Sequence, residues 1–266
     1  MTYNPDCTLL LVVDDSHLDE LVCSLPTWYV CHSEIASFPV VLMYDVESVS
    51  QSDVRIGLLE RVVRDFGNVG SFRKVPWPTP DVAWDGHREK MLLAYVHGAS
   101  YVDTKWFLKI DTDAIGSKRT ASFLKQEWFD SDVAFVSNPR YRIDYTLKQL
   151  PRLEAWAKNV PFLSEEPTPD YAALRSKRTP IKVCSWLMFG NTEWFNLVAK
   201  HCSSLPVPSQ DSFHSYVAMK YGARWVPVEF SKLGWDHKIS KSVARSPLLD
   251  KCPGILKKYG YEVPNA

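Results

Sequence analysis

The sequence lacks several features that would each point to a particular class of protein. It has no excess charge of either sign, with 31 basic and 31 acidic residues, so no net field favours nucleic acid or anionic lipid. Its longest apolar runs, such as Leu9 to Val13, are too short to span a bilayer. It contains no G-x-G-x-x-G, the pattern that dinucleotide-binding enzymes use. We therefore expect a globular protein with no transmembrane segment and no nucleic-acid partner.

The sequence also shows no secretory signal at its start and no paired cysteine motif. Residues 1–6 lack the basic and apolar segments of a secretory signal. No C-x-x-C pair occurs, and several cysteines sit among apolar neighbours, which indicates buried free thiols and not a disulfide frame or a zinc site. We therefore expect a reducing compartment and a cytoplasmic location. The cysteines are Cys7, Cys23, Cys31, Cys184, Cys202 and Cys252.

The first part of the chain alternates short apolar runs with amphipathic segments. This order predicts an α/β fold with a mainly parallel sheet and right-handed crossovers. Ser16 is a candidate cap for the first helix, Pro26 is expected to interrupt it, and a second helical piece is expected to run to about Ala36. Strands are predicted at 8–13, 39–44, 71–75 and 106–110, and helices at 52–67 and 85–97.

The second part of the chain is less regular. A polar, proline-bearing stretch at 161–180 predicts a long surface loop or lid. No internal repeat is visible, so one continuous domain covering 1–266 is the simplest organisation, with halves at 1–115 and 116–266. Strands are predicted at 132–136, 182–189 and 224–228, and helices at 147–159, 192–201 and 210–221.

The most informative motif is Asp111-Thr112-Asp113, which follows the apolar run Trp106 to Ile110. Side chains two residues apart on a strand point to the same side, so Asp111 and Asp113 can converge on one cation. Open α/β sheets bind ligands at the carboxyl ends of their strands. Two hard oxygen donors there suit Mg²⁺ or Mn²⁺ with a substrate phosphate completing the shell. A plain polar turn is the alternative interpretation.

In its order of elements from Thr8 to His237, the chain resembles the glycosyltransferases of the GT-A fold, which use nucleotide sugars. The resemblance is carried by acids at strand ends, the D-x-D motif, Gln210-Asp211 at the start of a late helix, and a late His237. It implies a Rossmann-like, mixed but mainly parallel sheet flanked by helices. It also implies a nucleotide-binding half at 1–115 and an acceptor-binding half with a C-terminal flap at 116–266.

The resemblance implies a divalent metal, Mn²⁺ or Mg²⁺, that bridges the two phosphates of a nucleoside diphosphate sugar, with a UDP-sugar favoured. Asp113 would be the direct ligand, while Asp111 would contact ribose or reach the metal through water. His237 would be a third ligand, and imidazole suits Mn²⁺ better than Mg²⁺. A histidine in a surface loop is the alternative for His237.

The resemblance also assigns residues to the nucleotide sugar. Asp14 and Asp45 lie where this fold receives the base and ribose, although an acid such as Asp14 or Asp15 can simply cap the next helix. Arg88 would reach the diphosphate, because its planar fork matches phosphate. Lys238, followed by Lys241 and Arg245, would close over the diphosphate as a cationic flap. Exposed charges are the alternative for these basic residues.

Two residues are assigned to the acceptor, a glycan or another hydroxyl compound. Asp211 would take the proton from the attacking hydroxyl, as the general base of an inverting reaction. The neighbouring Gln210 departs from the acidic pair that is usual in the family, and helix capping is the alternative role for Asp211. Trp186 lies on the segment that forms the acceptor floor, where its ring could stack on a sugar or belong to the core.

Three other functions compete with this one. Asp111 to Ile115 comes close to the D-x-D-x-[TV] motif of haloacid-dehalogenase phosphatases, but those enzymes place it on the first strand, and no late G-D-x-x-x-D is present. A nucleotidyltransferase would need a glycine-rich loop after the first strand, and residues 12–17 contain no glycine. A non-catalytic protein that binds nucleotide sugars would keep the metal site without turnover.

Overall fold

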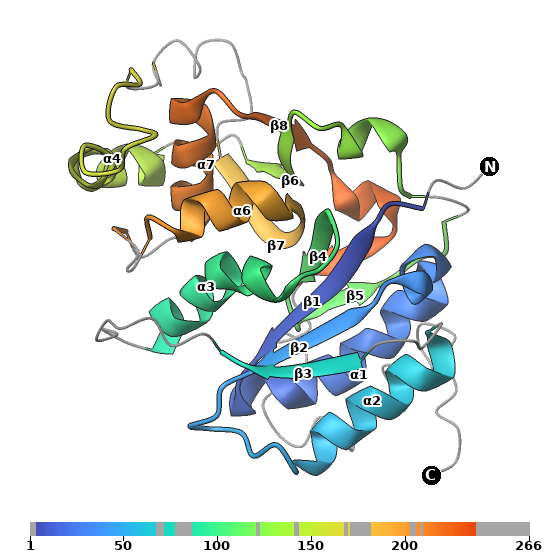
Figure 1. Ribbon diagram of the computed structural model, residues 1–266. Coiled ribbons are helices and arrows are strands. Elements are labelled where there is room, and N and C mark those ends of the chain that lie inside the picture. Colours follow the sequence, from blue (N-terminus) through green and yellow to red (C-terminus); the bar gives the residue numbers. More distant parts are fainter. Residues whose placement is uncertain are drawn as a thin grey trace.

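The computed structural model describes residues 4–67, 72–77, 87–120, 123–140, 144–167, 170, 182–202, 206–207 and 210–237 of the chain. Of residues 87–92, 140, 144–146, 182–184 and 237 it describes only the backbone. Figure 1 shows a central sheet with helices on both faces. The predicted α/β fold is confirmed.

A mixed, seven-stranded sheet forms the centre of the molecule, in the order β3-β2-β1-β4-β7-β6-β8. The four strands from β3 to β4 are parallel, whereas β7 runs antiparallel to both of its neighbours, β4 and β6. The sheet takes strands from both 1–115 and 116–266. The strands are β1 Cys7–Val13, β2 Val40–Tyr44, β3 Phe72–Pro76, β4 Trp106–Ile110, β6 Val133–Arg140, β7 Lys182–Asn191 and β8 Arg224–Pro227.

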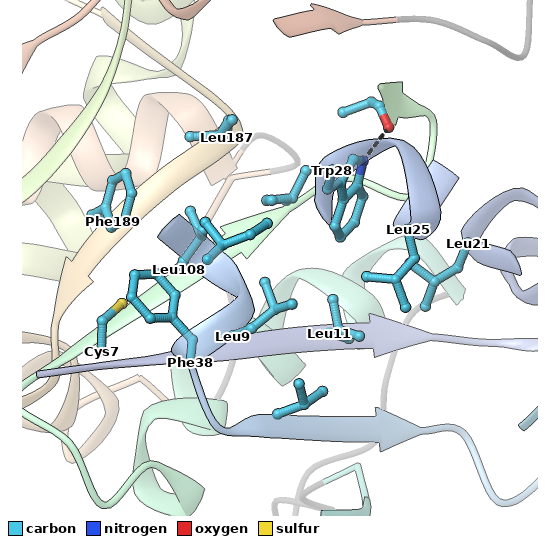
Figure 2. Packing of buried hydrophobic residues seen from close by; sticks show 14 of the residues in the cluster. Cys7, Leu9, Leu11, Leu21, Leu25, Trp28, Phe38, Leu108, Leu187 and Phe189 are labelled. Carbon is cyan, nitrogen blue, oxygen red and sulfur yellow. Dashed lines mark hydrogen bonds between the residues drawn. The ribbon is translucent and has the colours of Figure 1, made fainter. Parts of the chain in front are cut away.

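Helices cover both faces of this sheet because its strands are apolar on both sides. In β1, Leu9 and Leu11 face the cluster that contains α1 (Asp15–Cys31) and α2 (Val54–Phe66). Leu10 and Val12 face the opposite cluster, with α3 (His87–Gly98), α6 (Thr192–Ala199) and α7 (Gln210–Tyr221). Figure 2 shows Leu9 and Leu11 beneath Leu21 and Leu25 of α1. Full burial of one such leucine contributes about 1.5–3 kcal/mol.

The sequence predicted the ends of α2 correctly but not the cap and the length of α1. The helix α2 begins after Asp53, whose side chain accepts from the amide of Arg55, and ends at Gly67, as predicted. The first helix is capped by Asp14 and not by Ser16, and it continues through Pro26 to Cys31. Pro26 lacks one backbone donor, but most of the residues around it are buried, so tertiary packing outweighs that loss. A separate 3₁₀ helix, Ser33–Ser37, follows.

A second, two-stranded sheet was not predicted. Its strands, β5 (Ala114–Gly116) and β9 (Trp235–His237), run antiparallel and pair Ala114 with His237. The ribbon lies on α1, where the Trp28 indole N–H donates to the Ala114 carbonyl at 2.7 Å (Figure 2). The Gly116 amide donates to Thr27 Oγ1 at 3.0 Å. The ribbon therefore connects the residues after the D-x-D motif to the late segment of the chain.

The remaining helical elements connect successive strands along the chain. α4 (Asp144–Ala157) contacts α7, and the short 3₁₀ helices are Ala99–Tyr101, Gln126–Phe129 and Phe230–Leu233. No helix within the described parts of the chain is long and apolar enough to cross a membrane.

The cysteines only partly follow the prediction. Cys7, Cys31 and Cys202 are buried free thiols, as expected. Cys23 is disulfide-bonded, and its partner lies outside the described side chains. The expectation of free thiols is therefore wrong for Cys23, because sequence spacing does not show which cysteines meet in space. A disulfide also removes part of the argument for a reducing compartment.

Candidate functional site

The predicted acids of the first and fourth strands meet at a topological switch point. β2 and β3 lie on one side of β1, and β4 lies on the other, so the chain reverses direction across the sheet between β1 and β4. Asp14 follows β1 and Asp111 follows β4, at the carboxyl ends of these two parallel neighbours. This is the place where open α/β sheets bind ligands.

Asp14 is the centre of a small hydrogen-bond cluster at the start of α1. Its side chain is 1% exposed, and its Oδ1 accepts from the His17 amide at 3.1 Å and from Ser16 Oγ at 2.7 Å. The same oxygen lies 2.7 Å from His17 Nδ1. Burial lowers the pKa of His17, but the hydrogen bond and charge of Asp14, with the charges of Glu20 and Asp111, raise it overall. Asp14 therefore caps α1, which was the alternative to a binding role. A substrate that contacts Asp14 would have to reach a carboxylate already bonded to Ser16 and His17.

Asp45 and Asp15 have different surroundings. Asp45 is 7% exposed and holds the turn after β2, where its carboxylate accepts from the Glu47 amide and from Ser48 Oγ, both at 3.2 Å. Asp15 lies on the surface and pairs with Arg55 Nη2 at 2.5 Å. Asp45 therefore lies near the ends of β1 and β2, whereas Asp15 belongs to a surface ion-pair network.

The D-x-D motif forms a turn between β4 and β5. The Asp111 amide donates to the Trp186 carbonyl at 2.6 Å, and the Ala114 amide donates to the Asp111 carbonyl at 3.0 Å. Thr112 is buried and donates from Oγ1 to Glu20 Oε2 at 2.8 Å. Asp111 and Asp113 flank it and are both partly exposed. The turn therefore keeps the central threonine inside and leaves both carboxylates accessible.

The buried Tyr95 on α3 lies near Asp14, Asp111 and Asp113. Burial of Tyr95 raises its pKa well above the usual value, and the charges of Asp111, Asp113 and Asp14 raise it further. One phenol on α3 thus lies within electrostatic reach of acids from two different strand ends. Three carboxylates therefore lie near Tyr95, and the buried Lys109 ammonium, which pairs with Asp111, balances part of their charge.

These residues fit a divalent metal whose coordination is completed by a substrate. Among the described side chains, no group of three or more His, Cys, Asp or Glu forms a closed metal site. Asp111 and Asp113 supply hard carboxylate oxygens, and the backbone of His237 lies opposite Ala114 in the small sheet. Mg²⁺ is typically held by one or two carboxylates together with substrate phosphates, and carboxylates suit Mn²⁺ as well. The donor set matches that arrangement.

Asp211 lies in the first turn of α7 and is held by β7. Its Oδ1 accepts from the Ser185 amide at 3.0 Å and from Ser185 Oγ at 2.7 Å. The neighbouring Gln210 is 5% exposed, and its side-chain nitrogen has no hydrogen-bond partner in the part of the chain that the structure describes. Asp211 is therefore fixed in orientation by a strand that also pairs with β4.

Three predicted residues lie partly or wholly outside the described structure. Arg88 belongs to α3, and the β9 backbone includes His237, but both side chains lie outside the described part. Lys238, like Lys241 and Arg245, lies outside the described residues altogether. The functions expected of these side chains remain predictions.

Trp186 is described and belongs to the core. It is 8% exposed and packs edge-on against Phe230, with ring centroids 6.3 Å apart. Trp186 is thus largely covered by its neighbours, and little of its side chain is left for an acceptor to contact.

Sequence reasoning missed the side chains that link these predicted residues. Lys109 is 2% exposed on β4, forms an ion pair with Asp111, and donates to the Ser185 carbonyl at 2.6 Å. A lysine inside an otherwise apolar strand was the available signal, since a buried ammonium needs partners. His17 was detectable by its position one helical turn after Asp14. Nothing in the sequence indicated that Glu20 would contact Thr112.

No protein-family model matches the chain, and no curated protein matches it in sequence. Among solved structures, the chain is similar to core-mannan synthase A (CmsA/Ktr4) from Aspergillus fumigatus in its Mn/GDP form. The TM-score is 0.54 at 13% identity, over 97% of this chain and 86% of that one.

Two further structures give similar values. The mannosyltransferase Ktr4p from S. cerevisiae matches with a TM-score of 0.53 and 10% identity, over 97% of this chain and 82% of that one. The bifunctional glycosyltransferase WbbM matches with 0.51 and 11% identity, over 86% of this chain, which spans only 40% of WbbM. At such identities the likeness concerns the fold. The chain has the GT-A fold of nucleotide-sugar glycosyltransferases, as predicted.

Proposed function

We propose that this protein is a metal-dependent glycosyltransferase that moves a sugar from a nucleoside diphosphate sugar to an acceptor hydroxyl. The observation that supports it is the D-x-D turn after β4, at the switch point of a GT-A fold. The solved structures of this fold include CmsA with Mn and GDP, which is consistent with the proposal.

The roles of the donor-side residues are those that the resemblance to the GT-A family implies. Asp113 would hold Mn²⁺ or Mg²⁺ directly, with Asp111 and His237 beside it. When bound, the ion neutralises the charge that develops on the departing diphosphate. Asp14 and Asp45 would orient the base and ribose at the ends of β1 and β2. Arg88 and Lys238 would bind the diphosphate.

Asp211 would act on the acceptor. Its Oδ1 is occupied by two hydrogen bonds from Ser185, so Oδ2 is the oxygen that would take the proton from the attacking hydroxyl. Attack on the face opposite the diphosphate gives inversion at the anomeric carbon. The small exposed part of Trp186 would contribute to the acceptor floor.

The donor is tested by thermal-shift measurements with UDP-, GDP- and TDP-sugars, with and without Mn²⁺. The family resemblance favours UDP, and the GDP in the CmsA structure makes GDP-sugars the matched comparison. Stabilisation that needs both nucleotide and Mn²⁺ is the expected result. A nucleotide effect that is independent of metal would contradict the proposed metal site.

A pair of aspartate variants locates the metal. Asp113→Asn is expected to weaken Mn²⁺-dependent nucleotide binding by about tenfold or more, which corresponds to about 1.4 kcal/mol. Asp65→Asn is the matched control, because Asp65 is exposed on α2, away from the strand ends. Equal affinities in the two variants would place the metal elsewhere.

Turnover separates an enzyme from a non-catalytic binder. Asp211→Asn is expected to retain nucleotide binding and to lose sugar transfer and donor hydrolysis. Loss of binding in this variant would contradict the acceptor-side role. Release of inorganic phosphate from simple phosphate esters by the wild type would instead favour the phosphatase alternative.

A further inference from the structure

A buried lysine connects the D-x-D motif with the opposite strand. Lys109 lies on β4, is 2% exposed, and forms an ion pair with Oδ1 of Asp111. Its Nζ also donates to the Ser185 carbonyl on β7 at 2.6 Å and lies 4.4 Å from the centre of the Tyr95 ring. Two acceptors and a π-face thus surround one ammonium in the core.

Ser185 continues this connection to α7. Its carbonyl accepts from Lys109, whereas its amide and its hydroxyl both donate to Oδ1 of Asp211, at 3.0 and 2.7 Å. Lys109 lies on β4 and Ser185 on β7, and these two strands are hydrogen-bonded neighbours. Next to them, the Asp111 amide donates to the carbonyl of Trp186. The order Asp111, Lys109, Ser185, Asp211 is therefore one continuous path of polar contacts.

We propose that Lys109 and Ser185 are positioning residues that hold the donor-side carboxylate of Asp111 and the acceptor-side carboxylate of Asp211 in one fixed frame. The proposal rests on the function proposed above, because it gives the two carboxylates their roles. Lys109 contacts Asp111 directly and reaches Asp211 through the backbone of Ser185, so it affects both carboxylates. The hydroxyl of Ser185 acts only on Asp211, whose acceptor geometry depends on a fixed carboxylate.

The physical cost of the lysine supports a role beyond folding. A buried ammonium must be desolvated, and an apolar side chain of similar length would fill the same space in β4 without that cost. Asp111 is 34% exposed, so water can hydrate its carboxylate if the lysine is removed. The ion pair with Asp111 is therefore not required for folding, whereas the buried Ser185 carbonyl would lose its donor in a lysine variant and stability would fall.

Three variants and one control test the frame. Ser185→Ala removes the hydroxyl but keeps the amide, Ser185→Thr keeps a hydroxyl, and Lys109→Met keeps the apolar stem without the charge. Ser24→Ala is the matched control, because Ser24 is fully buried and its hydroxyl donates within α1 to the Leu21 carbonyl. Mn²⁺ binding with UDP or GDP is measured by electron paramagnetic resonance, next to steady-state transfer and the melting temperature.

The two residues should give different patterns. Ser185→Ala is expected to bind Mn²⁺ and nucleotide within twofold of wild type and to keep the donor KM, but to lose about tenfold or more in kcat. Ser185→Thr should recover most of that loss. Lys109→Met is expected to lose about tenfold in Mn²⁺–nucleotide affinity as well as in kcat. Ser24→Ala should leave all three quantities unchanged.

Several outcomes would overturn the proposal. One is wild-type kcat in Ser185→Ala, and another is a loss of kcat that parallels losses in metal affinity and melting temperature, as a merely structural role would give. Wild-type affinity in Lys109→Met would also overturn it, and if that variant does not fold, the two Ser185 variants decide. A wild-type protein that binds neither UDP nor GDP with Mn²⁺ would instead overturn the proposed function, and this inference with it.

Discussion

Two fully buried tryptophans, Trp28 and Trp235, differ in one hydrogen bond. The Trp28 indole N–H donates to the Ala114 carbonyl at 2.7 Å, whereas the Trp235 N–H has no hydrogen-bond partner among the described residues. Trp28→Phe is therefore expected to leave a buried carbonyl unsatisfied, which costs about 1–3 kcal/mol beyond the loss of ring size. Urea unfolding measures the change.

Trp235→Phe is the matched control for that hydrogen bond. Both rings are 0% exposed, and both substitutions remove the same atoms. Trp235→Phe breaks no hydrogen bond, although its ring stacks on His32 at 4.1 Å. The free energy of unfolding should therefore fall further in Trp28→Phe. Equal losses in the two variants would mean that the Ala114 carbonyl finds another partner.

At the residue scale, the sequence predicted positions better than partners. Asp14 and Asp111 could be placed at strand ends, because an apolar run followed by an acid is a local pattern. The contact of Lys109 with Ser185 could not be predicted, since it depends on β7 being the neighbour of β4. The capping role of Asp14 was among the alternatives, but its choice over Ser16 depends on backbone geometry.

At the scale of elements, the β5–β9 ribbon depends on a glycine. Gly234, directly before β9, has φ of 86°, and a Cβ there would lie 2.2 Å from the Lys118 carbonyl oxygen. Gly234→Ala is expected to cost about 1–2 kcal/mol for the left-handed backbone and about 1–3 kcal/mol more for the clash. Because β9 carries His237, Mn²⁺-dependent nucleotide binding should weaken too. Urea unfolding and nucleotide titration measure both effects.

Gly222 provides the control for Gly234. It follows α7 with φ of 75°, and a Cβ there would meet nothing within 4 Å. Gly222→Ala should therefore show only the backbone cost, with nucleotide binding unchanged. If the two alanine variants lose the same stability, the backbone near Lys118 must move easily. If Gly234→Ala binds Mn²⁺ and nucleotide as wild type does, β9 does not contribute a ligand.

Elements with strong local signals were predicted well, and those made by distant pairing were not. α2 has an apolar stripe, an aspartate before it and a glycine after it, and α7 was predicted with the bounds that the structure has. The three-residue strands β5 and β9 are too short to show a period, and they pair across a large separation in the chain. Pro26 misled because a local rule took no account of the buried surroundings of α1.

At the scale of the whole molecule, the sequence predicted the sheet but not its mixed direction in detail. The alternation of strands and helices up to β4 correctly gave parallel neighbours. The antiparallel insertion of β7 between β4 and β6 leaves no periodic pattern in the sequence. That strand brings Ser185 beside Lys109, so the link between the donor and acceptor sides could not be predicted before the topology was known.

Two buried histidines make the stability of the whole fold depend on pH. Burial lowers the pKa of His32 to about 4, although its hydrogen bond to the Gly234 carbonyl works in the opposite direction. Burial also lowers the pKa of His214 to about 3, and the charge of Lys109 adds to this effect. Both rings are therefore neutral in the folded protein at pH 5, where an unfolded histidine with a pKa near 6.5 is protonated.

The sign of the pH dependence follows from this difference. As the pH falls below about 6.5, the unfolded state takes up protons that the folded state does not, so the free energy of unfolding decreases. At pH 4 the loss for His214 is about 3 kcal/mol, from about 1.4 kcal/mol for each pH unit. For His32 the loss levels off near pH 4, where the folded ring also becomes protonated.

His214→Leu tests this dependence with little change in volume. The His214 ring lies near Phe135, Phe195 and Phe213, and its Nε2 has no hydrogen-bond partner within the described ranges, so an apolar side chain suits the site. Urea unfolding between pH 8 and pH 4 should show that the variant loses about 3 kcal/mol less than wild type over this range. Above pH 7 the two proteins should have parallel profiles, because both histidines are then neutral in either state. Parallel profiles down to pH 4 would show that His214 accepts a proton in the folded core, and that Lys109 and the phenylalanines around it do not keep it neutral.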